Sequence, residues 1–143
     1  MDLAKFLEAR IAEDRLLALT SCAGSNDREW TAEPEGMFEG RILDSRGETV
    51  VYDEGSPTHA QAMHIARHDP ARVLREAGAK RKILAYHAPE FTDYRDGDGI
   101  ERGTYECTEC DPGGSPDNWP CRTMRALAAV YADHKDYQQE WGQ

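Results

Sequence analysis

The chain has 143 residues, 31% of them charged, and its formal net charge is −10 at pH 7. A chain of this length usually forms one domain and buries roughly two-thirds of its unfolded surface, so we expect a single domain over residues 1–143. The negative charge disfavours non-specific binding to nucleic acid. No stretch approaches the ~20 apolar residues that cross a bilayer, and the opening MDLAKFLEAR lacks the pattern of a signal peptide. We therefore expect a cytoplasmic protein without membrane association.

The first predicted element is an amphipathic helix from Asp2 to about Leu19. Its apolar residues recur mostly at intervals of three and four, as in Leu3, Phe6, Leu7, Ile11 and Leu17. The run SCAGSND supplies the small and polar residues that end the helix. Cys22 lies in this run, where a lone cysteine is typical of a small buried side chain, with a distant metal ligand as the alternative.

Residues 30–52 favour β structure. The segments MFEGRIL and ETVVY flank the turn sequence DSRG and predict an antiparallel hairpin. Trp30 can begin a third strand, although Pro34 and Gly36 interrupt the run. Two or three strands are unstable alone and need helices over their apolar face, so the predicted fold class is α+β.

A helix is predicted over residues 58–68, where Thr58 and Gln61 have the spacing of a capping box. His64 and His68 on this helix have the separation that lets two imidazoles share a metal ion. However, the run HIARH lacks the glutamate of a zincin motif. We therefore favour surface or capping histidines at these positions.

A long central helix is predicted over residues 69–87, because Asp69 can cap it and Pro70 suits the first helical position. Its apolar line contains Val73, Leu74, Ala77 and Leu84. The same spacing places His87 on the buried face at the end of the helix.

A C-terminal helix is predicted to begin at Pro120, with a buried stripe of Met124, Leu127, Ala128 and Tyr131. Cys121 would then lie in the first turn, where the helix dipole should lower the pKa of its thiol. Arg122 and Arg125 could donate hydrogen bonds to its sulfur, but solvent exposure is the more usual state of such side chains. In the tail, Tyr137 and Trp141 are expected to fasten a short final turn.

The strongest functional signal is a group of cysteines, three of which lie within fifteen residues. Cys107 and Cys110 form a CxxC pair, and the loop DPGGSPDNWP joins them to Cys121, as in a zinc knuckle. In a reducing compartment this pattern favours a metal ion over disulfides. His87 is the predicted fourth ligand, since FTDYRDGDGIERGTYE forms a loop long enough to fold back, and a core histidine is the alternative. Other possible ligands are His59, His64, His68, His134 and Cys22.

Three thiolates and one imidazole would fill the four positions of a structural Zn²⁺ and leave none for water. A zinc deaminase or related hydrolase is a weaker interpretation, because that chemistry needs His-x-Glu and Pro-Cys-x-x-Cys. Here Glu90 comes one residue too late after His87, and no proline precedes Cys107. The sequence also contains no phosphate loop, nucleophile elbow or dinucleotide fingerprint.

Two classes of function remain. The favoured one is a non-enzymatic module, an adaptor or inhibitor, that binds an unidentified protein through its acidic surface. A variant of it is DNA mimicry by the carboxylates of Asp93, Asp96, Asp98 and Glu101. The alternative is a nucleic-acid-binding zinc module that uses the basic residues Arg67, Arg72, Arg75, Lys80, Arg81 and Lys82.

Three blocks occur in one order: HIARHDPARVLREAGAKRKIL, then CTEC, then PCRTMRALAAVYADHKDY with Trp141. In these blocks the chain resembles an uncharacterised family of small actinobacterial and actinobacteriophage proteins, a domain of unknown function. The resemblance implies a cytoplasmic, often phage-encoded protein with metal stabilisation and no established reaction. Lys135 in place of a proline and Gly78 within the long helix depart from the pattern, and neither departure affects the predicted ligands.

Overall fold

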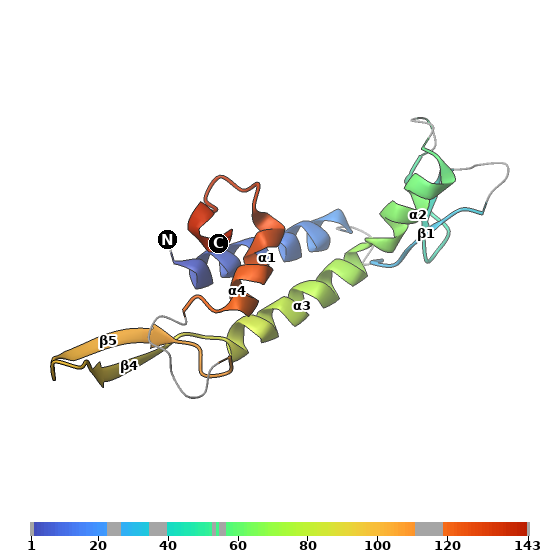
Figure 1. Cartoon of the computed structure of the whole chain (residues 1–143). Coiled ribbons are helices and arrows are strands. Elements are labelled where there is room, and N and C mark those ends of the chain that lie inside the picture. Colours follow the sequence, from blue (N-terminus) through green and yellow to red (C-terminus); the bar gives the residue numbers. More distant parts are fainter. Residues whose placement is uncertain are drawn as a thin grey trace. The chain divides into compact units, whose positions relative to one another are not determined.

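The computed structural model describes residues 2–22, 27–34, 40–52, 54, 57–110 and 119–142. It confirms an α+β fold with an N-terminal helix, a three-stranded antiparallel sheet, further helices and a C-terminal helix (Figure 1). The chain divides into two compact units: Met1–Ile11 with Ala79–Gln143 forms the first, and Ala12–Gly78 forms the second. The single domain expected over the whole chain stays a prediction.

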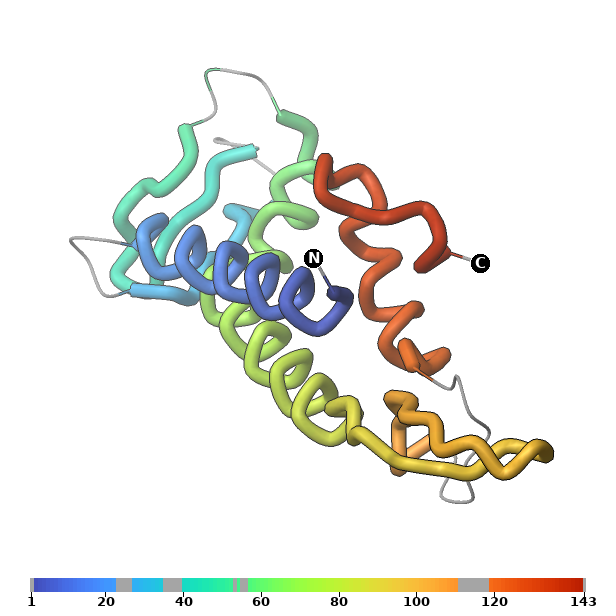
Figure 2. Tube along the Cα trace, turned by 90° about the vertical axis from the view of Figure 1, so that its left-hand side faces the viewer, coloured from blue at the N-terminus to red at the C-terminus, as the bar shows by residue number. Residues whose placement is uncertain are grey.

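The first unit has an aromatic core at the start of α1 (Leu3–Ser21), where Phe6 is fully buried. Four rings from the C-terminal segment surround Phe6, with centroids 4.9 to 6.3 Å away: Tyr131, His134, Tyr137 and Trp141. Figure 2 shows the start of α1 beside this C-terminal segment. Aromatic packing therefore holds the short helices η2 (Ala129–Tyr131) and η3 (Gln139–Gly142), as the sequence predicted for the tail.

The second unit contains three short antiparallel strands in the order β1 (Trp30–Ala32), β2 (Ile42–Asp44) and β3 (Thr49–Val51). The predicted hairpin and the third strand at Trp30 are thus confirmed. Helix α2 (His59–Arg67) covers the sheet, because its small residues Ala62 and Ala66 pack against Ile42. The partly buried side chains of Trp30, Ala32 and Val51 complete this apolar cluster.

One predicted cap begins α2, and a second predicted cap begins α3 (Pro70–Tyr86). The Thr58 side chain accepts a hydrogen bond from the Gln61 N–H, and Gln61 accepts one from the Thr58 N–H, which is the reciprocal pattern of a capping box. The Asp69 carboxylate accepts from the Arg72 N–H at 2.7 Å and from the Trp30 N–H at 3.3 Å. It therefore caps α3 and also fixes the start of β1.

The segment predicted as a loop after the central helix is instead a second hairpin. Strands β4 (Glu90–Arg95) and β5 (Glu101–Glu106) pair antiparallel in continuous register from Glu90↔Glu106 to Arg95↔Glu101. Figure 1 shows this hairpin extending away from the end of α3. The loop prediction was wrong because these strands are polar and have no buried residue, so the apolar alternation that marks a covered strand is missing.

Two predicted connections lie partly outside the described residues: the run that ends the first helix and the loop DPGGSPDNWP. Among the described residues, no helix is long and apolar enough to cross a membrane.

Candidate metal centre

The structure brings together the four residues predicted as ligands. The ligand atoms of His87, Cys107, Cys110 and Cys121 all lie within 4.8 Å of one another, so the group can hold a metal ion. Cys107 and Cys121 are buried, His87 is partly buried, and Cys110 is exposed. All four residues belong to the first unit.

The second hairpin explains how His87 and Cys107 meet. His87 follows the last turn of α3, where its N–H donates to the Ile83 carbonyl at 3.0 Å. The pairing of Glu90 with Glu106 then closes the base of the hairpin, and Cys107 is the next residue. The strand ladder thus returns the chain to the end of α3, whereas a flexible loop of this length would have to lose much conformational entropy.

Local backbone hydrogen bonds position the other two cysteines. The Cys110 N–H donates to the Cys107 carbonyl at 3.3 Å and tightens the CxxC turn. Cys121 occupies the N-cap position of α4 (Arg122–Ala128), with an extended backbone (φ −69°, ψ 166°). The prediction that the helix begins at Pro120 was therefore wrong. The Arg125 guanidinium donates to the Pro120 carbonyl at 2.8 Å and holds the chain just before Cys121.

The His87 ring points one nitrogen at all three sulfurs. Nδ1 lies 3.3 Å from Cys107 Sγ, 3.4 Å from Cys110 Sγ and 3.7 Å from Cys121 Sγ. Hydrogen bonding alone does not explain this convergence, because a ring nitrogen carries either one N–H or one lone pair. A cation placed between the four atoms would bind all of them at once.

The thiols differ in their electrostatic surroundings. Burial raises the pKa of Cys121 to about 11, which reverses the lowering predicted from the helix dipole. The physical reason is that Cys121 is 1% exposed and α4 is short, so desolvation of the thiolate outweighs the dipole. A hydrogen bond with the Thr123 hydroxyl lowers the pKa of Cys110. Cys121 therefore becomes a thiolate at neutral pH only when a cation compensates for its burial.

The other candidate ligands lie outside this cluster. Cys22 is buried and its thiol donates to the Ala18 carbonyl at 3.2 Å, in keeping with a small core side chain. His134 contacts the Arg10 guanidinium and the Phe6 ring. His59, His64 and His68 belong to the second unit.

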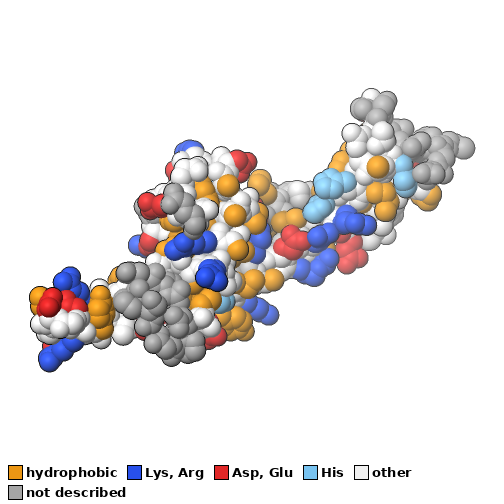
Figure 3. Space-filling view, viewed as in Figure 1, with side chains coloured by type: hydrophobic (Ala, Val, Ile, Leu, Met, Phe, Trp, Pro, Cys, Tyr) orange, Lys and Arg blue, Asp and Glu red, His pale blue; other side chains and the backbone are white. Residues whose placement is uncertain are grey.

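The charged residues named in the sequence are mostly exposed. In the basic region, Arg72 pairs with Glu76 at 2.7 Å, and the Lys80 ammonium lies 5.0 Å from the centre of the Tyr131 ring. In the second hairpin, Asp96 pairs with Arg102 and Glu101 pairs with Arg95. Figure 3 shows both acidic and basic side chains on the visible face.

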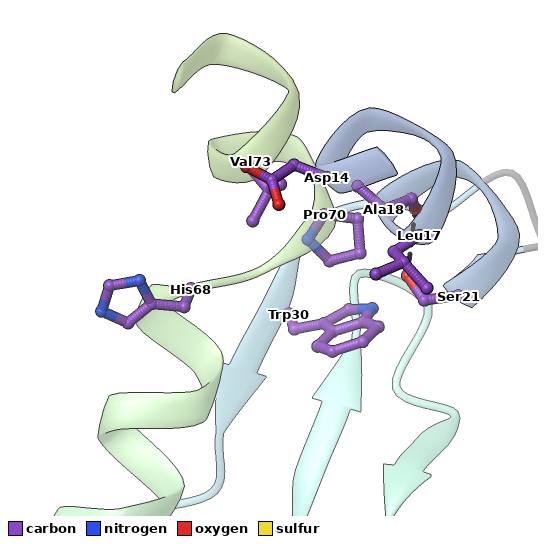
Figure 4. A pocket seen from close by; sticks show the side chains of 8 residues that line it. All are labelled: Asp14, Leu17, Ala18, Ser21, Trp30, His68, Pro70 and Val73. Carbon is purple, nitrogen blue, oxygen red and sulfur yellow. Dashed lines mark hydrogen bonds between the residues drawn. The ribbon is translucent and has the colours of Figure 1, made fainter. Parts of the chain in front are cut away.

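The second unit has a shallow apolar hollow of about 340 Å³ between α1, β1 and the start of α3. Figure 4 shows the Trp30 indole on one side of it, next to Pro70 and Leu17, and the His68 ring directed away from Trp30. Asp14 and Ser21 are the other polar side chains in the lining. This lining does not resemble a phosphate loop, a nucleophile elbow, a dinucleotide-binding site or a zinc deaminase site.

Comparison with known proteins adds a family but no activity. No curated protein and no solved structure matches the chain. A family model described as "Family of unknown function (DUF6221)" matches residues 1–143. The resemblance to a domain of unknown function is thereby confirmed, and the chain belongs to this family of unknown function.

Proposed function

We propose that the chain is a non-enzymatic protein-interaction module, an adaptor or inhibitor, stabilised by a structural zinc ion. The observation that carries the proposal is an exposed aromatic face on an acidic hairpin, next to a group of four potential ligands.

The donor distances support zinc. Around a tetrahedral ion with Zn–S near 2.3 Å and Zn–N near 2.05 Å, neighbouring nitrogen and sulfur ligands lie about 3.6 Å apart. The three distances from His87 Nδ1 are 3.3, 3.4 and 3.7 Å. Three sulfurs and one imidazole nitrogen are also a donor set typical of structural zinc.

Four protein ligands leave no coordination position for a reacting water, which favours a structural role over a hydrolytic one. The ion with three thiolates would carry a net charge of about −1. Zinc binding would contribute on the order of 10 kcal/mol to folding. The proposal includes a reducing, cytoplasmic compartment, since none of the four cysteines forms a disulfide.

The second hairpin has one face that is open to solvent. Phe91 and Tyr105 are cross-strand partners on this face, with ring centroids 5.3 Å apart, and they are 59% and 55% exposed. The neighbouring residues on the same face, Asp93, Arg95, Glu101 and Gly103, are exposed as well. Exposed aromatic residues with a polar rim are typical of binding surfaces.

The charge of this hairpin indicates the chemistry of the partner. Residues 90–106 contain six acidic and two basic side chains, Arg95 and Arg102. Each of the two arginines pairs with one carboxylate, so the hairpin keeps a net negative charge. A partner surface with arginine or lysine would complement it, because such cations also stack on aromatic rings. Because of these ion pairs the hairpin is a weaker mimic of DNA, since the DNA backbone has no cationic groups of its own.

The proposal is tested by capture of partners with the zinc-loaded chain and with the double variant Phe91→Ser/Tyr105→Ser. A matched control is Val130→Ser, since Val130 is 61% exposed outside the hairpin. We expect a protein that is retained by the original chain and by the control but lost with the double variant or after chelation. Retention that is equal for the original chain and both variants would contradict this surface. Salt-dependent retention on DNA or RNA would instead support the basic region of residues 67–82.

A further inference from the structure

The histidine pair of the second unit, His64 and His68, takes no part in the cysteine cluster. Its ring centroids lie 4.7 Å apart, and the ring planes are inclined by 50°. Both residues are exposed. Figure 3 shows histidine side chains at the surface of this unit, and Figure 4 shows the His68 ring in the lining of the hollow, turned away from Trp30. The two imidazoles are therefore adjacent to each other and accessible from solvent.

The separation of the rings matches two imidazoles on one ion. With a metal–nitrogen distance near 2.05 Å, each ring centre lies about 3.2 Å from the ion, so the centres are about 4.5 Å apart at a 90° angle and about 5.2 Å apart at a tetrahedral angle. The observed 4.7 Å lies between these values. The separation of the two rings is therefore compatible with both imidazoles binding one ion.

The backbone under the pair is already fixed. The His68 N–H donates to the carbonyls of His64 and Ile65, at 3.3 and 3.0 Å, and closes the end of α2. The following residue, Asp69, is held by its bonds to Trp30 and Arg72. Binding an ion therefore costs only the ordering of two side chains, and not of a loop.

We infer that the histidine pair is a second, labile binding site for a divalent transition-metal ion such as Ni²⁺ or Cu²⁺. Neutral imidazole is a preferred ligand of these ions. Within the described ranges, the only group of three or more potential ligands is the cysteine cluster, so the pair supplies two nitrogen donors and water completes the coordination. Arg67, which lies between the two histidines in the sequence, adds positive charge and keeps the affinity below that of the four-ligand site.

The test is a calorimetric titration of nickel(II) chloride into the zinc-loaded chain in a buffer that does not bind metals. We expect one Ni²⁺ per chain and a rise in melting temperature, because an ion that binds only the folded state stabilises it. His64→Ala and His68→Ala should each weaken this binding at least about tenfold, since each removes one arm of the chelate. His59→Asn is the matched control, because it removes an imidazole from the same helix but not from the pair.

Zinc content, measured in each sample, separates this site from the cysteine cluster. It should stay the same in all variants. Nickel binding that is unchanged in both alanine variants, or absent from the original chain up to about 1 mM, would overturn the inference. Circular dichroism excludes unfolding of α2 as the cause of lost binding, and His64→Gln is a second variant that preserves side-chain volume.

Discussion

Two hairpins among the described residues, β2–β3 (the first hairpin) and β4–β5 (the second hairpin), have the same turn but different support. In the first, Asp44 Oδ1 accepts the N–H groups of Arg46 and Glu48 at 3.0 and 2.9 Å, and Gly47 has a positive φ of 81°. In the second, Asp96 Oδ1 accepts the N–H groups two and four residues on, both at 3.0 Å, and Gly99 has a φ of 76°. An arginine pairs with the aspartate in each turn, Arg46 in the first and Arg102 in the second.

The difference lies in what covers the strands. Ile42 in the first hairpin is fully buried under α2. In the second hairpin no residue is buried, and its partly buried residues all lie on one face. An isolated two-stranded hairpin is at best marginally stable in water. A hairpin can therefore be fixed by an apolar cover or by a clamp at its base, and in the second hairpin the cysteine cluster is the candidate clamp.

The largest expected effect comes from breaking that clamp with Cys107→Ser. Loss of a thiolate should remove the ion and with it a contribution on the order of 10 kcal/mol to the folding of the first unit. We expect lower metal content, a lower melting temperature and rapid hydrogen exchange in residues 90–106, whereas the amides of β2 and β3 stay protected. Cys22→Ser is the matched control, since Cys22 lies outside the cluster. Full loss of metal with unchanged stability would refute the clamp.

Replacing the imidazole ligand tests the same clamp from α3. His87→Ala removes the nitrogen that faces all three sulfurs. Metal affinity should fall by more than roughly 100-fold, because changes to residues that merely orient a ligand already reach that range. Competition with a chromophoric chelator measures the affinity, and normal zinc retention would place the fourth ligand elsewhere.

Ile42→Ala weakens the apolar cover of the first hairpin. The cavity left under α2 should cost about 2–5 kcal/mol in the free energy of unfolding. Denaturant titration measures the loss. Zinc content should remain unchanged, because Ile42 belongs to the second unit. A simultaneous loss of metal would show that the two units depend on each other for folding.

Phe91→Ala should have a small effect on stability, in contrast to Ile42→Ala. Phe91 is exposed, and its pairing with Tyr105 contributes about 0.2–1 kcal/mol, as is usual for cross-strand pairs. Thermal unfolding with zinc bound is the measurement. A loss of unfolding free energy as large as that of Ile42→Ala would mean that the second hairpin depends more on aromatic packing than on the cysteine cluster at its base.

Acid should affect the two turns alike. Hydrogen bonds from Arg46 and Arg102 hold the pKa values of Asp44 and Asp96 below the ordinary 3.8. Each carboxylate therefore contributes stability that is fully present above pH 3.8 and is lost as the pH falls through the lowered pKa of the folded state. Carboxyl chemical shifts followed by NMR should show both aspartates titrating below 3.8. Titration of either one at its ordinary value would break the equivalence of the turns.

Local signals in the sequence were sufficient for much of the fold. The capping box of Thr58 and Gln61 predicted the start of α2. The pair Asp69-Pro70 predicted the start of α3. The turn DSRG predicted the first hairpin, because the strands beside it are apolar. The turn DGDG also has Asp at its start and Gly at its end. The sequence nevertheless predicts a loop there, because strand prediction depends on a buried face that the second hairpin does not have.

The donor types of the candidate centre and the spacing of its cysteines follow from the sequence. It left the choice of His87 among several histidines open, because residues so far apart meet only through the pairing of β4 with β5. The position of His87 Nδ1 opposite the three sulfurs is visible only in the folded chain. The same is true of the burial that, in place of the helix dipole, governs the pKa of Cys121. Capping and turn formation depend on neighbours in the chain, whereas desolvation and ligand geometry depend on atoms brought together by folding.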